Sequence, residues 1–284
     1  MGLKMKVRFP KFDFSEIRAH WTKNPEFAQR CNAASLIPAY VEPYLLKVMN
    51  QARAKIDPSK TALLKDLDIF NKQEMQHLKQ HIGFNKRMHA IGYEGLKTFE
   101  AEYAADYERF LATKSLRFHL AYCEGFESLS ATACELYFTA YNEFLDDADP
   151  EPTNMWRWHL AEEFEHRTVC SDVYHELAGL DPVSRYFYRL YGYFYAIIHI
   201  GGFSNRVSKW LLEQDRAKMT PEEVEQSLAR DKYARKIMGK GFLPMAFKIM
   251  MPWYDPAKRP TPPGYDAYLQ SFEKNYNKPE LAAA

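Results

Sequence analysis

The sequence predicts an all-α protein built on a four-helix bundle. Apolar residues recur at helical spacing along almost the whole chain, and the alternation typical of strands is absent. Two of the expected helices also carry acidic and histidine side chains at matching spacings. Regular helical spacing predicts the fold class, and the paired polar positions predict that the centre of the bundle has a chemical role.

The helices follow from the apolar spacing and from the residues that stop or start it. Asp57-Pro58-Ser59 ends the first helix, Asp149-Pro150-Glu151-Pro152 separates two later ones, Gly179 ends another, and Thr220-Pro221 starts the last. Residues 1–30 are expected to be irregular, and the proline-rich tail from Pro244 on is expected to be extended. The expected helices are 33–55, 60–87, 98–112, 114–146, 154–178, 183–214 and one that begins near 221. We expect one domain over 1–284, with a core bundle at about 33–179 and accessory helices and tail at about 183–284.

Composition excludes several classes of partner. Lys and Arg number 38 against 37 Asp and Glu, so the charge balance favours neither nucleic acid nor an anionic membrane. The longest apolar run, from Leu190 to Phe203, is too short to span a bilayer. The four cysteines form no C-x-x-C pair and the N-terminus has no apolar signal segment, so we expect a cytoplasmic protein.

Two helices carry dense sets of metal-binding side chains. The second expected helix contains Glu74-x-x-His77-x-x-x-His81, and the helix at 154–178 contains His159-x-x-x-Glu163-x-x-His166. At about 100° per residue, each set falls within roughly 60° of one helix face. A Glu-x-x-His motif places a carboxylate and an imidazole one turn apart, and two such motifs with two further carboxylates form a di-metal site in helical bundles.

The two further carboxylates are predicted from distance along the chain. Glu42 precedes Glu74 by 32 residues, with equal helical travel on either side of the turn near Pro58, so both carboxylates reach one level. Glu127 precedes Glu163 by 36 residues, and Glu124 precedes Glu163 by 39. The separation of 36 is closer to the 32 of the first pair, which favours Glu127 and leaves Glu124 as a neighbour or alternative ligand. The predicted metal ligands are Glu42, Glu74, His77, Glu127, His159, Glu163 and His166.

Other polar residues near these motifs have more than one interpretation. His81 is expected to orient a ligand by a hydrogen bond, with direct metal binding or a surface position as alternatives. Glu124 is expected to play a similar supporting role if it is not a ligand. Glu162 and Glu165 lie beside the motif, and side chains of this kind are more often solvated or salt-bridged than bound to metal.

These motifs resemble those of a bacterial family described as predicted metal-dependent hydrolases. The run from Trp156 to His166 reads WRWHLAEEFEH and resembles the family's W-R-W-H-x-x-E-E-x-E-H signature. Gln73 to Asn85 resembles its Q-E-x-x-H-x-x-x-H-x-x-x-N stretch, and the segment beginning at Glu127 resembles its E-H-x-T-A segment, with serines at 128 and 130 in place of His and Thr. The ligand pattern is also similar to that of ferritin-like di-iron arylamine N-oxygenases, in which His159 would correspond to an additional histidine ligand.

The residues and these resemblances together predict a ferritin-like di-metal enzyme. Four carboxylates and three imidazoles suit redox-active iron better than hydrolytic zinc, with manganese or zinc as alternatives. We expect O₂-dependent oxidation of a small organic substrate that is apolar or aromatic, with O₂ as co-substrate and an external electron donor. The alternatives are a hydrolase that uses a metal-bridging hydroxide and a non-enzymatic metal-binding scaffold. A homodimer is a further expectation.

Overall fold

The computed structural model describes residues 5–277. Within that range the secondary structure is helical apart from one isolated β-bridge between Pro10 and Asn277, which confirms the predicted all-α class. The elements, in chain order, are α1 (Pro25–Ala34), α2 (Leu36–Arg53), α3 (Thr61–Ala90), α4 (Leu96–Thr113), α5 (Leu116–Tyr137), α6 (Asn142–Leu145), α7 (Pro150–Glu165), α8 (Val169–Leu177), α9 (Pro182–Arg216), α10 (Pro221–Ile249), the 3₁₀ helix η1 (Pro256–Lys258) and α11 (Tyr265–Asn275).

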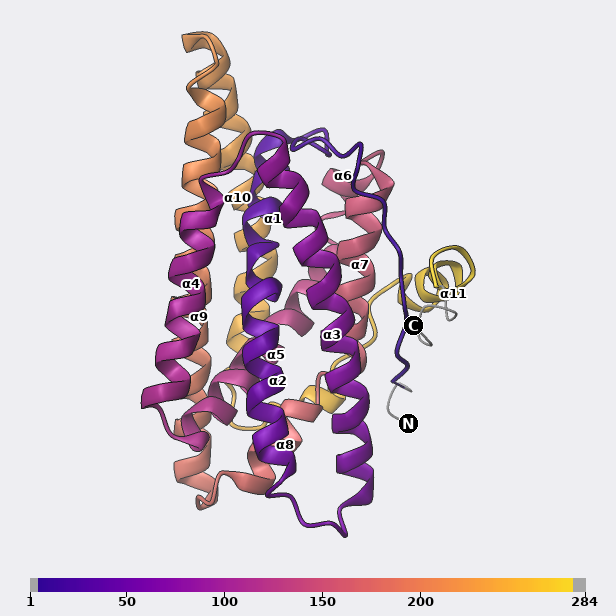
Figure 1. Cartoon of the computed structure of the whole chain (residues 1–284), viewed down its shortest axis with the longest axis vertical. Helices are drawn as coiled ribbons and strands as arrows, with labels where there is room; N and C mark the ends of the chain where they lie inside the picture. The colour runs from indigo at the N-terminus through magenta and orange to yellow at the C-terminus, as the bar shows by residue number, and fades with distance from the viewer. Residues whose placement is uncertain (1–4, 278–284) are drawn as a thin grey trace.

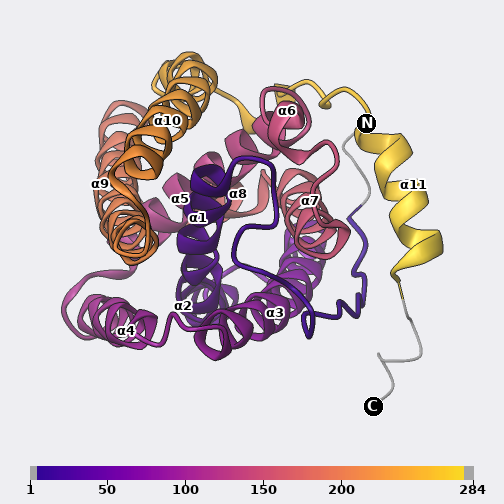
Figure 2. The ribbon, with the colours of Figure 1, turned by 90° about the horizontal axis from the view of Figure 1, so that it is seen from above.

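Four helices form the central bundle. Helix α2 packs on α3, α3 on α7, α7 on α5, and α5 back on α2, which closes a ring of four. Figure 2 shows these helices from above, with α2 and α3 on one side and α5 and α7 on the other. Their inward faces carry aromatic and aliphatic side chains that belong to one buried core.

The remaining helices cover this bundle from outside. Helix α9 packs along α5, α10 contacts α5 and α1, and α4 contacts α2 and α9. Helix α11 packs against α7, and the described part of the chain begins and ends on that side of the molecule, where Pro10 pairs with Asn277 (Figure 1). The close contact of α5 with α9 depends on two glycines. A Cβ on Gly192 would lie 2.4 Å from the carbonyl carbon of Ala121, and one on Gly125 would lie 2.8 Å from Cα of Tyr193.

Two N-terminal expectations are corrected by the structure. Residues 1–30 are not wholly irregular, because Asn24 caps α1 by accepting a hydrogen bond from the Phe27 amide and Pro25 occupies its first turn. The expected helix at 33–55 is divided at Ser35, where α1 ends and α2 begins.

The expected long helices also differ at their ends. The helix at 114–146 ends at Tyr137, and the short α6 follows it. The helix at 154–178 starts earlier, at Pro150, and is interrupted after Glu165 before α8 begins at Val169. The tail is not simply extended, since α10 continues through Pro244 to Ile249 and α11 forms beyond it.

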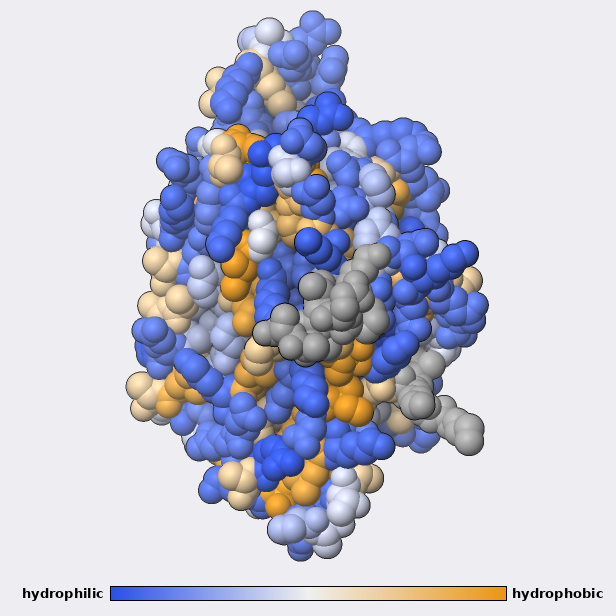
Figure 3. Space-filling model, turned by 45° about the vertical axis from the view of Figure 1, so that its right-hand side comes forward, coloured by the Kyte–Doolittle hydropathy of each residue, from blue (hydrophilic) through white to orange (hydrophobic). Residues whose placement is uncertain are grey.

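The face of the molecule drawn in Figure 3 is largely polar. Hydrophilic residues cover most of the face in Figure 3, and hydrophobic residues are scattered among them. Among residues 5–277, none of the helices combines the length and the apolar character that crossing a membrane requires.

Candidate metal centre

All seven side chains predicted as metal ligands converge inside the central bundle. Each is at most 2% exposed. Helix α2 contributes one, α3 two, α5 one and α7 the rest, the last from the residue that caps its C-terminus. In that order they are Glu42, Glu74, His77, Glu127, His159, Glu163 and His166.

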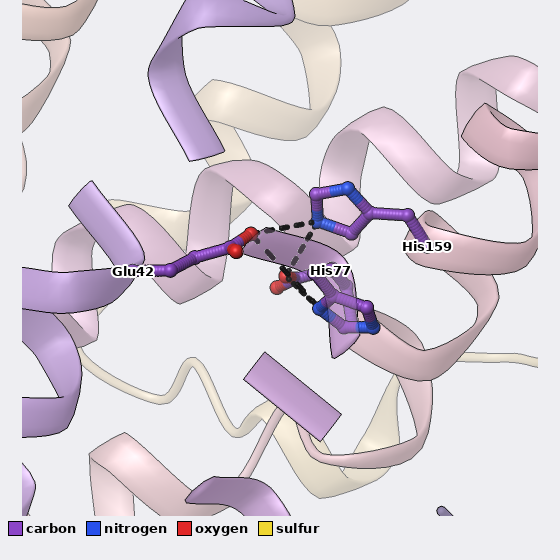
Figure 4. Close-up of side chains that lie close together, drawn as sticks. Glu42, His77 and His159 are labelled. Atoms are coloured by element: carbon purple, nitrogen blue, oxygen red, sulfur yellow. Dashed lines mark hydrogen bonds and ion pairs between the residues drawn. The ribbon is translucent and has the colours of Figure 1, made fainter. Parts of the chain in front are cut away.

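The first of two groups consists of Glu42, His77, His159 and Glu163, whose donor atoms all lie within 4.8 Å of one another. His159 Nε2 is 2.9 Å from Glu163 Oε1 and 3.5 Å from Glu42 Oε1. His77 Nδ1 is 3.6 Å from the same Glu163 oxygen. Figure 4 shows Glu42, His77 and His159 pointing toward one another from different helices.

The second group consists of Glu74, Glu127, Glu163 and His166, with donor atoms within the same limit of 4.8 Å. His166 Nε2 lies 3.2 Å from Glu74 Oε1, 3.2 Å from Glu127 Oε2 and 3.3 Å from Glu163 Oε2. One ring nitrogen carries at most one hydrogen, so it cannot satisfy three carboxylates at once.

Two carboxylates connect the groups. Glu163 directs Oε1 toward the first group and Oε2 toward the second. Glu74 does the same, with Oε2 3.8 Å from His77 Nδ1 and Oε1 against His166. The arrangement therefore has two adjacent positions that share Glu163, with Glu74 reaching from the second group toward the first.

The local sequence explains why α7 supplies three of these side chains. Asp149 caps the helix by accepting a hydrogen bond from the Glu151 amide, and prolines occupy its first turn. His159 and Glu163 are one turn apart on its inner face. His166 adopts φ −98° and ψ 10° just past the helix end, which keeps its side chain on the inner face although the chain then turns away.

Burial and mutual repulsion leave the carboxylates poorly stabilised as a protein-only cluster. Burial raises the pKa of Glu42 well above its ordinary value, and the charges of Glu74 and Glu163 add to this effect. Burial and the Glu163 charge similarly raise the pKa of Glu127. For Glu163 itself burial acts in the same direction, but the neighbouring imidazoles of His166 and His159 outweigh it and lower its pKa.

Several of these atoms also lack hydrogen bonds. Both carboxylate oxygens of Glu42, Glu74 and Glu127, and Nδ1 of His77, are buried without a well-formed hydrogen bond to any described residue. Leaving buried polar atoms unpaired is costly, and buried charges are normally paired or coordinate a metal. The donor set therefore fits a pair of cations.

Each of the three imidazoles also has a hydrogen-bond partner at the ring nitrogen that faces away from the donor groups. His159 Nδ1 lies 2.7 Å from His81 Nε2, whose Nδ1 lies 2.8 Å from the Ser35 hydroxyl. Burial lowers the pKa of His81 well below its ordinary value, and the imidazoles of His159 and His77 lower it further, which favours the neutral ring. The structure thus places His81 where an orienting residue belongs, behind His159 and outside both groups.

The other two imidazoles have comparable partners. His77 Nε2 lies 3.0 Å from Glu162 Oε2, and His166 Nδ1 lies 3.1 Å from the Gln73 side-chain oxygen. Hydrogen bonds of this kind fix the ring orientation and leave the other nitrogen free to bind a metal.

Glu124 is buried but belongs to neither group. Its Oε1 lies 3.5 Å from Nη1 of Arg189, and the Ser128 hydroxyl donates a hydrogen bond to it at 3.4 Å. Of the two carboxylates considered on this helix, the structure brings Glu127 to the cluster and directs Glu124 toward α9.

Glu162 and Glu165, expected to be solvated or salt-bridged rather than bound to metal, are both buried and ion-paired. Arg8 Nη1 lies 2.9 Å from Glu162 Oε1, and Arg8 Nη2 lies 2.8 Å from Glu165 Oε1. The sequence motifs contain a signal for Gln73, because this residue is the first of the Q-E-x-x-H stretch that includes Glu74 and His77. They contain none for Arg8, which reaches the site from more than 150 positions away.

Comparisons with known proteins bear on this centre. Neither the curated proteins nor the solved structures include a significant match to the chain. A family model described as "predicted metal-dependent hydrolase" matches residues 6–259, which cover the central bundle and all the clustered donors. This chain, with its two buried groups of glutamate and histidine, belongs to the predicted metal-dependent hydrolase family.

Proposed function

We propose that the protein is an enzyme whose active centre is a pair of divalent metal ions, one in each four-residue group. The observation that supports this proposal most directly is that the buried carboxylate oxygens of Glu42, Glu74 and Glu127 lack hydrogen bonds. Four ionised carboxylates and two divalent cations sum to zero charge, so binding two ions would offset the burial and the mutual repulsion that raise the pKa values of Glu42, Glu74 and Glu127.

The donor set favours iron or manganese. Each group combines carboxylates with imidazoles, and each has four protein side chains when Glu163 is shared. Catalytic zinc sites more often have three protein ligands, whereas this arrangement by helix is that of di-iron and di-manganese carboxylate proteins. When bound, such a metal pair supplies one-electron transfer and the ability to react with O₂. Our first candidate reaction is therefore O₂-dependent oxidation of a small organic substrate, with electrons from an external donor.

The protein's own residues would orient and insulate the pair. The Ser35, His81 and His159 hydrogen bonds fix one ring, and Glu162 and Gln73 fix the other two. With His159 Nε2 facing the carboxylates, its Nδ1 would donate to His81 Nε2, and His81 Nδ1 would donate to the Ser35 hydroxyl. The aromatic rings of Trp158 and Phe70 pack edge-on against His77 and His166 and exclude water from that side.

Hydrolysis is the second candidate, and the description of the matching family favours it over oxidation. In this candidate the metal pair supplies Lewis-acid chemistry toward a carbonyl or phosphoryl group. The same seven side chains would hold the ions, so the two candidates differ in the metal and the reaction rather than in the residues.

Metal analysis with two activity assays separates the candidates. The full chain would be purified from cells supplied with iron, manganese and zinc together, its metals quantified, and its absorbance followed when the reduced protein meets O₂. Iron or manganese near two per chain with an O₂-dependent spectral change supports oxidation. Zinc at two per chain with ester or phosphoester turnover supports hydrolysis. A chain that retains no metal, with Glu163→Ala identical to the wild type, would overturn both.

A further inference from the structure

A small apolar cavity lies beside His159, one of the seven candidate ligands. It lies where the junction of α1 and α2 meets α5, α7 and α9, and its volume is about 150 Å³. Apolar side chains form most of its wall, among them Ile37, Phe126, Leu129, Ala133, Leu160 and Ile200. A cavity of about this size with an apolar lining is large enough for a single aromatic ring.

His159 connects the cavity to the candidate metal site. The residue forms part of the cavity wall, while its Nε2 faces Glu163 and Glu42 at 2.9 and 3.5 Å. A molecule in the cavity is thus separated from the first group of donors by one imidazole ring. Glu42, His77 and Glu163 do not line the cavity, so a ligand there would approach the first group from the His159 side.

The wall also limits the charge of what can bind. None of the side chains lining the cavity is an acid, a lysine or an arginine. A charged ligand would have to lose its hydration without gaining an ionic partner, which is strongly unfavourable. The cavity therefore selects for uncharged molecules.

One aromatic ring of the cavity wall stacks on His159. The Trp156 side chain is 5% exposed, lines the cavity and lies nearly parallel to the His159 ring, with centroids 5.9 Å apart. Its indole N–H has no hydrogen-bond partner among the described residues. That nitrogen is itself buried, so Trp156 offers the cavity its aromatic surface rather than a donor.

We propose that this cavity is the substrate-binding pocket, and that the substrate presents an uncharged, ring-sized apolar group. The inference rests on the proposed function, because it assigns the substrate class of the same metal centre. In it, Ala133 and Leu129 set the size of the ring that fits, and Trp156 orients the ring relative to His159.

The test is binding of simple probes to the metal-loaded full chain, measured by calorimetry and tryptophan fluorescence without turnover. Phenol is uncharged at pH 7, and benzoate has a similar ring with a negative charge. We expect phenol to bind at least about tenfold more tightly than benzoate. Equal binding of the two probes, or no phenol binding, would overturn the proposal.

A matched pair of variants locates the binding. Ala133→Phe should fill the cavity and weaken phenol binding at least about tenfold, with the metal content unchanged. Ala104→Phe places the same side chain in a separate cavity of about 110 Å³ between α2 and α4, and should leave phenol binding unchanged. Retention of phenol binding in Ala133→Phe, or an equal loss in both variants, would contradict the assignment.

A crystal soak covers the case in which Ala133→Phe does not fold. Bromobenzene soaked into wild-type crystals should give an anomalous bromine peak beside Trp156 and His159, and a peak elsewhere alone would overturn the proposal.

The outcomes also separate the pocket proposal from the proposed function. Probe binding in the cavity of a chain that never holds metal would sink the proposed function and leave the pocket, whereas two bound metals with no probe in the cavity would do the reverse.

Discussion

Glu162 Oε2 lies 3.0 Å from Nε2 of His77, on the side of the imidazole that faces away from the two donor groups. His77 Nδ1 faces inward, 3.6 Å from Glu163 and 4.0 Å from Glu42. The other oxygen of Glu162 is bound by Arg8. A chain of contacts thus runs from the N-terminal segment through Glu162 and His77 to the candidate metal centre.

Replacing Glu162 with glutamine should weaken metal binding without abolishing it. The amide can still accept a hydrogen bond from His77, but it lacks the charge that makes the imidazole a better donor to a metal. Loss of such supporting carboxylates typically lowers metal affinity about 10- to 100-fold. A titration against a chelator should show this loss at one of two bound ions.

The control for Glu162→Gln is Glu100→Gln. Glu100 lies 3.1 Å from His89 in a carboxylate–imidazole pair that belongs to neither donor group. Glu100→Gln should leave metal affinity at the wild-type value. The same loss of affinity in both variants would show that the Glu162 contact has no special role.

Replacing Arg8 with alanine should strongly destabilise the fold. The guanidinium is 3% exposed and joins Glu162 to Glu165, so its removal leaves two buried carboxylates without their partner. Breaking a buried ion pair in this way costs about 3–5 kcal/mol in the free energy of unfolding. Arg53→Ala, which breaks an exposed pair with Asp68, should cost less than about 1 kcal/mol. Denaturant titration would measure both, and similar losses would contradict the prediction.

The deficit of Arg8→Ala should also depend on pH. Burial raises the pKa of Glu165, and Arg8 opposes this effect, so the folded-state pKa rises further in the variant. A carboxyl group whose pKa is higher in the folded state binds protons preferentially there, so lowering the pH stabilises that state. The difference from wild type should therefore be largest near neutral pH and shrink on acidification. A difference that grows as pH falls would argue against this assignment.

Removing metal should lower the melting temperature, and Glu127→Gln should reduce that effect. A ligand at about 1,000 times its dissociation constant stabilises the folded state by about 4 kcal/mol. That corresponds to a shift of roughly 8–16 °C for a chain of this size. Glu127→Gln removes one donor and one buried charge, so it should diminish the difference between metal-loaded and chelated protein.

Glu124→Gln is the matched control for Glu127→Gln, one turn away on the same helix. Its carboxylate contacts Arg189 and lies outside both donor groups, so the metal-dependent shift should persist. Thermal scans of both variants with and without chelator would decide. A larger loss of the shift in Glu124→Gln than in Glu127→Gln would reverse the assignment.

The convergence of the seven donors could be predicted from the spacing of these residues along the sequence. Glu74 and His77 lie one turn apart, as do Glu163 and His166, so helical geometry alone puts each pair on one face. Glu42 could be matched to Glu74 because a short turn returns the chain to the same level. Glu124 and Glu127 lie on adjacent positions of one face, and only the packing of α5 against α9 directs the former away from the centre.

Contacts with the N-terminal segment could not be predicted in the same way. Arg8 lies outside any helix and binds residues on α7, and periodicity carries no information about such a distant partner. The interruption after Glu165 was also missed, because no proline or glycine marks it. Continuation of α10 through Pro244 was missed for the opposite reason, since proline usually ends a helix.

The most direct test of the central claim is anomalous diffraction from crystals of the metal-loaded protein, collected on both sides of the iron and manganese absorption edges. The account predicts two peaks inside the bundle, one among Glu42, His77 and His159 and the other among Glu74, Glu127 and His166, with Glu163 between them. Crystals of Glu163→Ala should show weaker occupancy at both positions. A wild-type crystal with one peak, or with peaks only outside α2, α3, α5 and α7, would contradict it.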